Sequence, residues 1–168
     1  MADTQPVTEL LPLSAPGSAV TDWAHAAQQL AESPTFWLAT VRPDGRPHVM
    51  PVLGAWVDGA LAVCTPGVTR KAKNLTANPQ CVMTVNRGTL DLVVEGEAKL
   101  VTDEVGQQAI GDAFAAKYGW KVALREGTFF ADNGSGLGEM PYSVFRVGPT
   151  TAFGLNTDQG FAVTRWRF

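Results

Sequence analysis

The chain has 168 residues, a length typical of one globular domain. Its formal net charge of -3 at pH 7 argues against a nucleic-acid-binding protein, which would usually present a basic face. Two cysteines do not make a disulfide framework, and no run of about 20 apolar residues is present to span a bilayer. The first residues lack the basic start and apolar core of a signal peptide, so we expect a cytoplasmic protein without a membrane partner.

The N-terminal part of the sequence divides into a tail and a helix. Residues 1–20 are rich in Pro, Ser, Thr and Ala without a hydrophobic period, which predicts a tail that is partly disordered or lies across the surface. Residues 21–168 are predicted to form a single domain. Within it, residues 22–32 carry apolar side chains at helical spacing behind Asp22, a plausible N-cap. The dipeptide Ser33-Pro34 ends this helix, because the residue before proline disfavours helical backbone angles.

Three strands are predicted next. Residues 35–41 form the first strand, and residues 46–57 form a second that is apolar on both faces, as in a strand buried on both sides. Pro51 in this second strand cannot donate to a ladder and therefore marks a bulge or an edge. The dipeptide Asp58-Gly59 is a hairpin signal, and it leads into a third strand over residues 60–65.

The second half of the chain continues the same pattern of short strands. A helix capped at Thr102-Asp103 is predicted to run to about Tyr118, and the glycine-rich residues 119–140 are predicted to be a long loop. The remaining strands are predicted over residues 80–85, 89–101, 141–147, 150–154 and 161–167. Seven or eight strands in hairpin order with two or three helices favour a mainly β protein: a closed or nearly closed antiparallel barrel with peripheral helices.

The stretch from Val63 to Leu75 is the strongest local indication of a binding site. A short apolar strand enters a Pro-Gly break, and a helix then begins with Arg70, Lys71 and Lys73, three of the thirteen Lys and Arg residues of the chain. Backbone donors at a helix start favour anions, and neighbouring cations strengthen that preference. One interpretation therefore places Thr65, Arg70, Lys71 and Asn74 around a phosphate. The alternative is a solvated basic helix, and the P-loop pattern GxxxxGK[ST] is absent.

Several segments in a fixed order resemble a known family. They are Phe-Trp-Leu-Ala-Thr-Val, Pro-Asp-Gly-Arg-Pro-His-Val-Met-Pro-Val, Thr-Pro-Gly-Val-Thr-Arg-Lys-Ala-Lys-Asn-Leu, Asp-Leu-Val-Val-Glu-Gly-Glu-Ala and the closing Thr-Arg-Trp-Arg-Phe. Together they resemble the pyridoxamine 5'-phosphate oxidase-like, FMN-binding split-barrel family, and within it the flavin- and deazaflavin-dependent oxidoreductases. The resemblance covers about residues 35–101 and the last strand.

The resemblance implies an antiparallel six-stranded split β-barrel that pairs as a homodimer with a cofactor, FMN or coenzyme F420, at the subunit interface. It implies hydride transfer between that cofactor and an unidentified small organic substrate, or alternatively a non-catalytic carrier of flavin, F420 or haem. The substrate-phosphate pattern of the true pyridoxamine phosphate oxidases is missing, so that activity is not expected. The cofactor-binding residues implied are His48, Val49, Met50, Pro51, Val52, Thr65, Arg70, Lys71, Asn74, Trp166 and Arg167.

Metal and serine-hydrolase chemistry find no support in the sequence. The patterns HExxH and GxSxG are absent, and no paired Cys and His spacing occurs. A lone histidine facing out from a strand, such as His48, is more often structural than functional. The alternating Asp91, Glu95 and Glu97 are better explained as the solvated face of a strand than as an acid-base pair. No catalytic side chain is therefore assigned.

Overall fold

Eleven strands and three helices make up the part of the chain that the structure, a computed structural model, describes, namely residues 5–158 and 160–168. In chain order they are β1 (Val7–Leu10), α1 (Trp23–Glu32), β2 (Phe36–Val41), β3 (Pro47–Val52), β4 (Ala55–Val57), β5 (Ala60–Thr65), α2 (Arg70–Ala77), β6 (Gln80–Arg87), β7 (Leu90–Leu100), α3 (Glu104–Tyr118), β8 (Lys121–Arg125), β9 (Thr128–Asp132), β10 (Met140–Asn156) and β11 (Ala162–Arg167).

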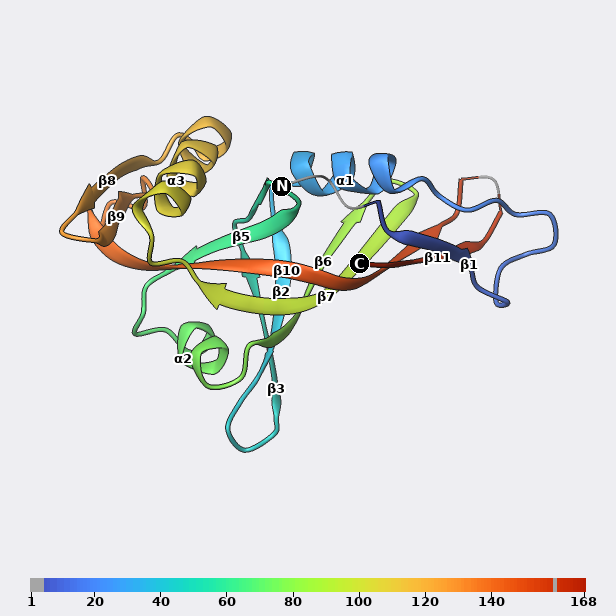
Figure 1. Cartoon of the computed structure of the whole chain (residues 1–168), viewed down its shortest axis with the longest axis horizontal. Helices are drawn as coiled ribbons and strands as arrows, with labels where there is room; N and C mark the ends of the chain where they lie inside the picture. The colour runs from blue at the N-terminus through green and yellow to red at the C-terminus, as the bar shows by residue number, and fades with distance from the viewer. Residues whose placement is uncertain (1–4, 159) are drawn as a thin grey trace.

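The barrel is built from antiparallel pairs (Figure 1). Strand β10 pairs with β7 on one side and with β5 on the other, and the sheet continues from β7 through β6 and β2 to β3. Strand β4 pairs with β5, and only Leu53 and Gly54 separate β4 from β3. Counted as one bent strand, β3 and β4 complete a six-membered circuit with β5, β10, β7, β6 and β2, although the ladder is interrupted at the bend. This confirms the predicted mainly β fold of the split-barrel type.

Strand β10 runs without a break where the sequence predicted two strands, so that prediction was wrong. The shift in pairing with β7 falls between Pro149 and Thr151 and leaves the strand intact. Proline lacks an N–H donor, so the ladder accommodates it as a local irregularity. The single strand can then reach β5 and β9 near its start and β11 near its end.

The glycine-rich region after α3 was predicted as a long loop, and this was also wrong. It contains the hairpin β8–β9, whose turn at Glu126 and Gly127 has φ values of +50° and +73°. Strand β9 pairs with the start of β10, and α3 packs beside the hairpin (Figure 1). The barrel therefore carries a second layer on the outer side of β5.

Strand β3 is exposed, although its sequence predicted burial on both faces. It ends the sheet beyond β2, and of its six residues only Val52 is fully buried. The prediction that Pro51 marks an edge is confirmed. Trp37 and Val41 on the neighbouring β2 are exposed as well, at 53% and 37%. An apolar strand pair therefore faces outward from the barrel.

The N-terminal segment is more ordered than the predicted tail. Val7–Leu10 forms β1 and pairs with β11, so that Val7 stands opposite Arg167. Further along, the Leu11 amide donates to the carbonyl of Val163, 2.8 Å away. Residues 1–4 of the predicted tail lie outside the described residues. The prediction therefore missed an edge strand.

Two apolar clusters support these layers. The larger fills the barrel, where Phe36, Leu38, Leu61 and Met83 have no exposed surface. The smaller lies between β5, α3 and the β8–β9 hairpin, and Phe114 is at its centre. Since both faces of β5 are covered, all six of its residues are buried. Within the described residues, no helix has the length and apolar character needed to cross a membrane.

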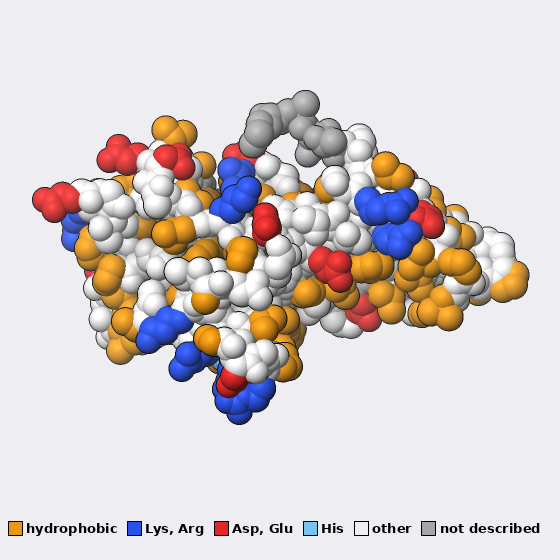
Figure 2. Space-filling view, turned by 60° about the horizontal axis from the view of Figure 1, so that its bottom comes forward, with side chains coloured by type: hydrophobic (Ala, Val, Ile, Leu, Met, Phe, Trp, Pro, Cys, Tyr) orange, Lys and Arg blue, Asp and Glu red, His pale blue; other side chains and the backbone are white. Residues whose placement is uncertain are grey.

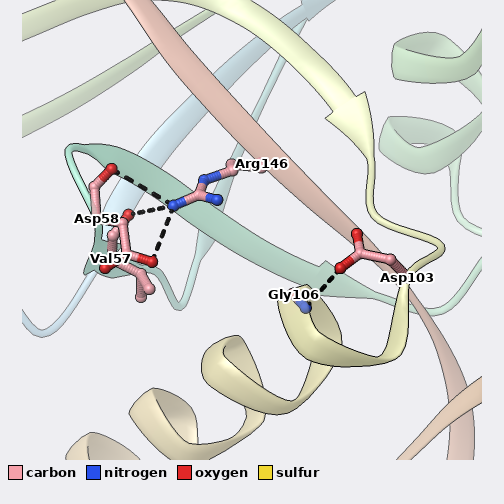
Figure 3. Close-up of polar contacts among 5 residues, drawn as sticks. All are labelled: Val57, Asp58, Asp103, Gly106 and Arg146. Carbon is pink, nitrogen blue, oxygen red and sulfur yellow. Dashed lines mark hydrogen bonds and ion pairs between the residues drawn. The ribbon is translucent and has the colours of Figure 1, made fainter. Parts of the chain in front are cut away.

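Local signals in the sequence explain how the elements begin and turn (Figure 3). Asp58 and Gly59 both have positive φ, at +48° and +74°, as the tight hairpin between β4 and β5 requires. The Arg146 guanidinium of β10 donates to the carbonyl of Val57 at 3.0 Å and fixes this turn. The Asp103 carboxylate accepts from the Gly106 amide at 2.8 Å and caps α3 as predicted. Asp22 precedes α1 at the predicted position but makes no side-chain capping bond.

Candidate functional site

A pocket of about 310 Å³ lies where β3, β5 and the start of α2 meet. Pro51, Val52 and Leu53 form one wall, from the end of β3 and the bend that follows it. Thr65, the last residue of β5, and Lys71, in the first turn of α2, also line it. The pocket therefore unites four of the predicted site residues from three separate parts of the chain.

The opposite wall comes from a region that the sequence did not assign to the site. Trp120 and Tyr142 line it, with ring centroids 5.3 Å apart, and Met140 lies beside them. Asn133 and Ser135 add polar groups from the loop after β9. Aromatic residues flanking a glycine-rich segment were the available signal, but only the fold shows that they approach β3. A planar ligand can stack or slide against such a wall.

The floor of the pocket lies at the start of α2, and we call it the anion cradle after its predicted ligand. Thr65 is 1% exposed, and its hydroxyl oxygen lies 3.0 Å from the hydroxyl oxygen of Thr69. Thr69 is the N-cap of α2 and accepts from the Ala72 amide at 3.4 Å. Unpaired N–H groups in the first turn of a helix carry partial positive charge, which favours an anion.

Three cations in the first half of α2 strengthen this preference. Among the described residues, none of the six ion pairs involves Arg70, Lys71 or Lys73. Figure 2 shows Lys and Arg side chains gathered at the lower end of the molecule, where Figure 1 places α2 and the β2–β3 turn. Arg70 and Lys73 are exposed, whereas Lys71 is partly buried, and this burial lowers its pKa. Of the pocket-lining residues in the described part of the chain, Lys71 alone is charged.

Asn74, which was predicted as a binding residue, lies inside the protein and does not line the pocket. Its side chain has no exposed surface, and its Nδ2 donates to the Thr40 hydroxyl at 3.0 Å. The Thr40 hydroxyl in turn donates to the carbonyl of His48 at 3.3 Å. Asn74 therefore joins α2 to the β2–β3 pair from inside the protein, although it lies only one helical turn after Lys71.

The two predicted C-terminal site residues are also placed elsewhere. Trp166 is fully buried in the barrel core and packs edge-on against Trp23, with ring centroids 5.4 Å apart. Arg167 forms an ion pair with Glu9, 3.4 Å away, and so links β11 to β1. Neither residue lines the pocket. Trp166 is a core residue, and Arg167 supports the strand pairing at the sheet edge.

The first half of β3 extends beyond the pocket. His48, Val49 and Met50 lie on this strand but do not line the pocket. Val49 is 51% exposed and Met50 is 43% exposed, while the Nδ1 atom of His48 is buried without a hydrogen-bond partner among the described residues. These three residues therefore form an accessible strand surface next to the pocket, and their role in binding stays a prediction.

Comparisons with known proteins place the chain in a family. Residues 23–155 match the family described as pyridoxamine 5'-phosphate oxidase, so the chain belongs to that family. The resemblance that the strand motifs carried is thereby confirmed. No curated protein matches the sequence.

Solved structures share the fold. A conserved hypothetical protein from Mycobacterium tuberculosis is 21% identical with a TM-score of 0.66, covering 83% of this chain and 88% of that one. A structure described as an F420 reductase is 28% identical with a TM-score of 0.53, covering 74% and 94%. An FAD-binding protein from Mesorhizobium loti is 18% identical with a TM-score of 0.57, covering 97% and 98%. The family match and these neighbours show that the chain has the split-barrel fold of this family.

Proposed function

We propose that this protein is a flavin- or deazaflavin-dependent oxidoreductase that binds FMN or coenzyme F420 and transfers hydride to or from a small organic substrate. The cofactor phosphate lies on Thr65, Arg70, Lys71 and the free amides of α2, and the ring system extends along β3. The F420 reductase among the structural neighbours supports the deazaflavin, and the FAD-binding protein supports a flavin.

One observation carries the proposal: a single pocket combines an anion cradle with apolar and aromatic walls. Phosphate oxygens prefer Lys and Arg donors and helix N-termini. Lys71 and the start of α2 provide a cation and a helix N-terminus beside Thr65, and the exposed Arg70 precedes Lys71 just outside the pocket lining. Among the described residues, the pocket lining contains no carboxylate that would repel an anion. The residues present therefore fit a phosphate-bearing cofactor with a planar ring.

The protein's own part in the reaction is binding and orientation. The bound cofactor supplies the hydride chemistry, which needs few acid-base side chains. Lys71 and Arg70 neutralise the phosphate, while Pro51 and Val52 hold the wall against which a ring lies. Trp120 and Tyr142 restrict the access of water from the opposite side and leave an apolar surface for an organic substrate.

We further propose that the protein is a homodimer. Residues that stand opposite one another on β2 and β3 form an apolar face that points outward from the barrel. Its members are Trp37, Ala39, Val41, Pro47, Val49 and Pro51. A groove of about 300 Å³ extends this face across Val82 of β6. Exposed apolar patches of this kind mark interaction sites, and β3 is also an unpaired strand edge.

A second copy on this face would reach the cofactor site. Pro51 belongs both to the outward apolar face and to the pocket wall. A partner covering the face therefore lies beside the pocket opening and completes it. This shared residue supports the proposed position of the cofactor at a subunit interface.

Direct titration tests the cofactor proposal. Purified protein is mixed separately with FMN and with F420, and binding is followed by fluorescence. We expect micromolar or tighter binding of one of them, and binding of neither would overturn the proposal. Reduction of the bound cofactor by a donor, with turnover of an acceptor, distinguishes an enzyme from a carrier of the same fold. The carrier is the second candidate because the described residues that line the pocket do not identify a group that would recognise a particular substrate.

A further inference from the structure

The bend at Gly54 has an unusual set of backbone partners. Gly54 lies between β3 and β4, so its peptide groups are outside the ladder, and yet the residue is buried. Its amide donates to the Tyr118 hydroxyl at 3.2 Å, and its carbonyl accepts from the same hydroxyl at 2.7 Å. The carbonyl also accepts from the Lys117 ammonium at 2.9 Å. Side chains from the last turn of α3 thus replace the missing strand partners.

No larger residue fits at the bend in place of Gly54. A Cβ on Gly54 would lie 2.9 Å from a ring carbon of Phe36, closer than such atoms approach. The Tyr118 hydroxyl also lies 3.0 Å from the carbonyl of Pro34, just before β2. The Lys117 ammonium lies 5.4 Å from the centre of the Phe36 ring. One helix turn therefore holds the start of β2 and the end of β3 together.

The same turn also leads into the opposite wall of the pocket. Only Gly119 separates Tyr118 from Trp120, which lines the pocket and packs on Phe114 with ring centroids 4.8 Å apart. Leu53, on the near wall, belongs to the same apolar cluster as Tyr118. Residues 117–120 are thus bonded to one wall and form part of the other.

We propose that Lys117 and Tyr118 are positioning residues for the ligand pocket: by holding Gly54 they set the distance of Pro51–Leu53 from Thr65, Lys71 and Trp120. We call the pair the Gly54 clamp. It touches neither the anion cradle nor the pocket surface, so it acts on the ring end of a ligand through the β3 wall. This inference rests on the proposed function for the identity of the ligand, but not for the mechanics of the bend.

Two ligands can be used to measure binding at the two ends of the pocket separately. FMN spans the cradle and the β3 wall, whereas inorganic phosphate reaches the cradle alone. In Tyr118→Phe and Lys117→Met we expect FMN affinity to fall about 3- to 10-fold, the value of one lost hydrogen bond. Phosphate affinity stays unchanged, and Lys117→Arg restores FMN binding because it keeps a donor and the charge. F420 replaces FMN in these titrations if it is the tighter ligand.

Amide hydrogen exchange measures directly how firmly the bend at residues 52–54 is held. We expect the amides of Val52, Leu53 and Gly54 to exchange faster in both clamp variants. The control is Asp103→Ala, which removes the N-cap at the far end of the same helix (Figure 3) and leaves the clamp in place. It lowers stability without accelerating exchange at residues 52–54 or weakening FMN.

The outcomes distinguish this inference from the proposed function. Equal loss of FMN affinity in Asp103→Ala and Tyr118→Phe would overturn the positioning role and leave only a general stability effect. Unchanged exchange at residues 52–54 in the clamp variants would overturn it as well. If wild-type protein binds neither FMN nor F420, the proposed function is wrong, and exchange at Val52 and Leu53 still decides whether the clamp positions the wall.

Discussion

The hydroxyl oxygens of Thr65 and Thr69 lie 3.0 Å apart, so the last residue of β5 is bonded to the N-cap of α2. This contact fixes where the helix starts relative to the barrel. It also leaves the first amides of α2 and the Lys71 side chain facing the same pocket as Thr65. The anion cradle is thus a junction between a strand and a helix.

Loss of this junction should lower stability. In Thr69→Ala, α2 loses its N-cap and Thr65 loses its hydroxyl partner, so we expect a decrease of ~1–2 kcal/mol in the free energy of unfolding. Urea denaturation measures it. Thr76→Ala, on the exposed side of the same helix, is the control and should change stability by less than about 0.5 kcal/mol. Equal effects would contradict the capping role of Thr69.

The two lysines of α2 provide a test of the cradle. Lys71 lines the pocket and Lys73 does not. Lys71→Ala should weaken binding of inorganic phosphate and of FMN by ~1.5–3 kcal/mol, the value of a charge-assisted hydrogen bond. Lys73→Ala removes the same charge from the exposed surface and should have a much smaller effect. Calorimetric titration of both variants decides; similar losses would mean that only the overall charge matters.

Binding should also depend on pH through Lys71. Burial lowers the pKa of its ammonium group below the ordinary 10.5, so the group loses its charge at a lower pH than an exposed lysine does. Phosphate affinity is therefore expected to decline as the pH rises, starting below 10.5. The decline should disappear in Lys71→Arg, whose guanidinium stays charged. A parallel decline in that variant would assign the effect to another group.

Lys117 predicts a change of stability at alkaline pH. Burial, and secondly the nearby Arg87, lower its pKa to about 8. Between about 8 and 10.5 the unfolded chain therefore binds more protons at this lysine than the folded protein, and the contribution of Lys117 to stability rises with pH across that window. The difference between wild type and Lys117→Met, measured by urea denaturation from pH 7 to 10, should show this rise. A flat difference would contradict the lowered pKa.

The outward apolar face predicts the oligomeric state. Trp37→Glu and Val49→Glu place charges at positions that are 53% and 51% exposed, where folding of one chain tolerates them. We expect both variants to be monomeric by sedimentation velocity, and wild type to be dimeric. Val105→Glu, at an 82% exposed position on α3, is the control and should stay dimeric. A monomeric wild type would rule out the homodimer.

The buried position of Trp166 can be tested against its predicted role in binding. Its Nε1 has no hydrogen-bond partner among the described residues, so Trp166→Phe removes packing but no polar contact. We expect a loss of ~1–3 kcal/mol in unfolding free energy. FMN affinity, measured well below the unfolding transition, should be unchanged. A selective loss of FMN affinity in Trp166→Phe would instead support the predicted role of Trp166 in binding.

Local signals explain which parts of the fold and site could be predicted from the sequence. The Asp58-Gly59 turn, the Asp103 cap and the cluster of cations behind the Pro-Gly break each act within a few residues, so their spacing is sufficient. Strand β5 was predicted with the observed ends because turn residues flank a short apolar run.

The remaining features depend on contacts between distant segments. Helical and strand spacing places Asn74 and Trp166 on a face but does not tell whether that face meets a ligand or the core. Pro149 is a strong break signal that the pairing partners of β10 override. Apolar residues on both faces of β3 indicate that both faces are covered. Within one chain only one of these faces packs against other residues.

Strand β10 has a consequence for the order of events during synthesis. It bonds to β5, β7, β9 and β11, and every other strand of the barrel circuit precedes it in the chain. During synthesis, β5 and β7 therefore each have one strand edge without its pairing partner until residues 140–156 have left the ribosome. Such edges are exposed to wrong pairing in the meantime. The helix α3 and the β8–β9 hairpin emerge before β10, but they pack on the face of β5, so its edge stays open until β10 arrives.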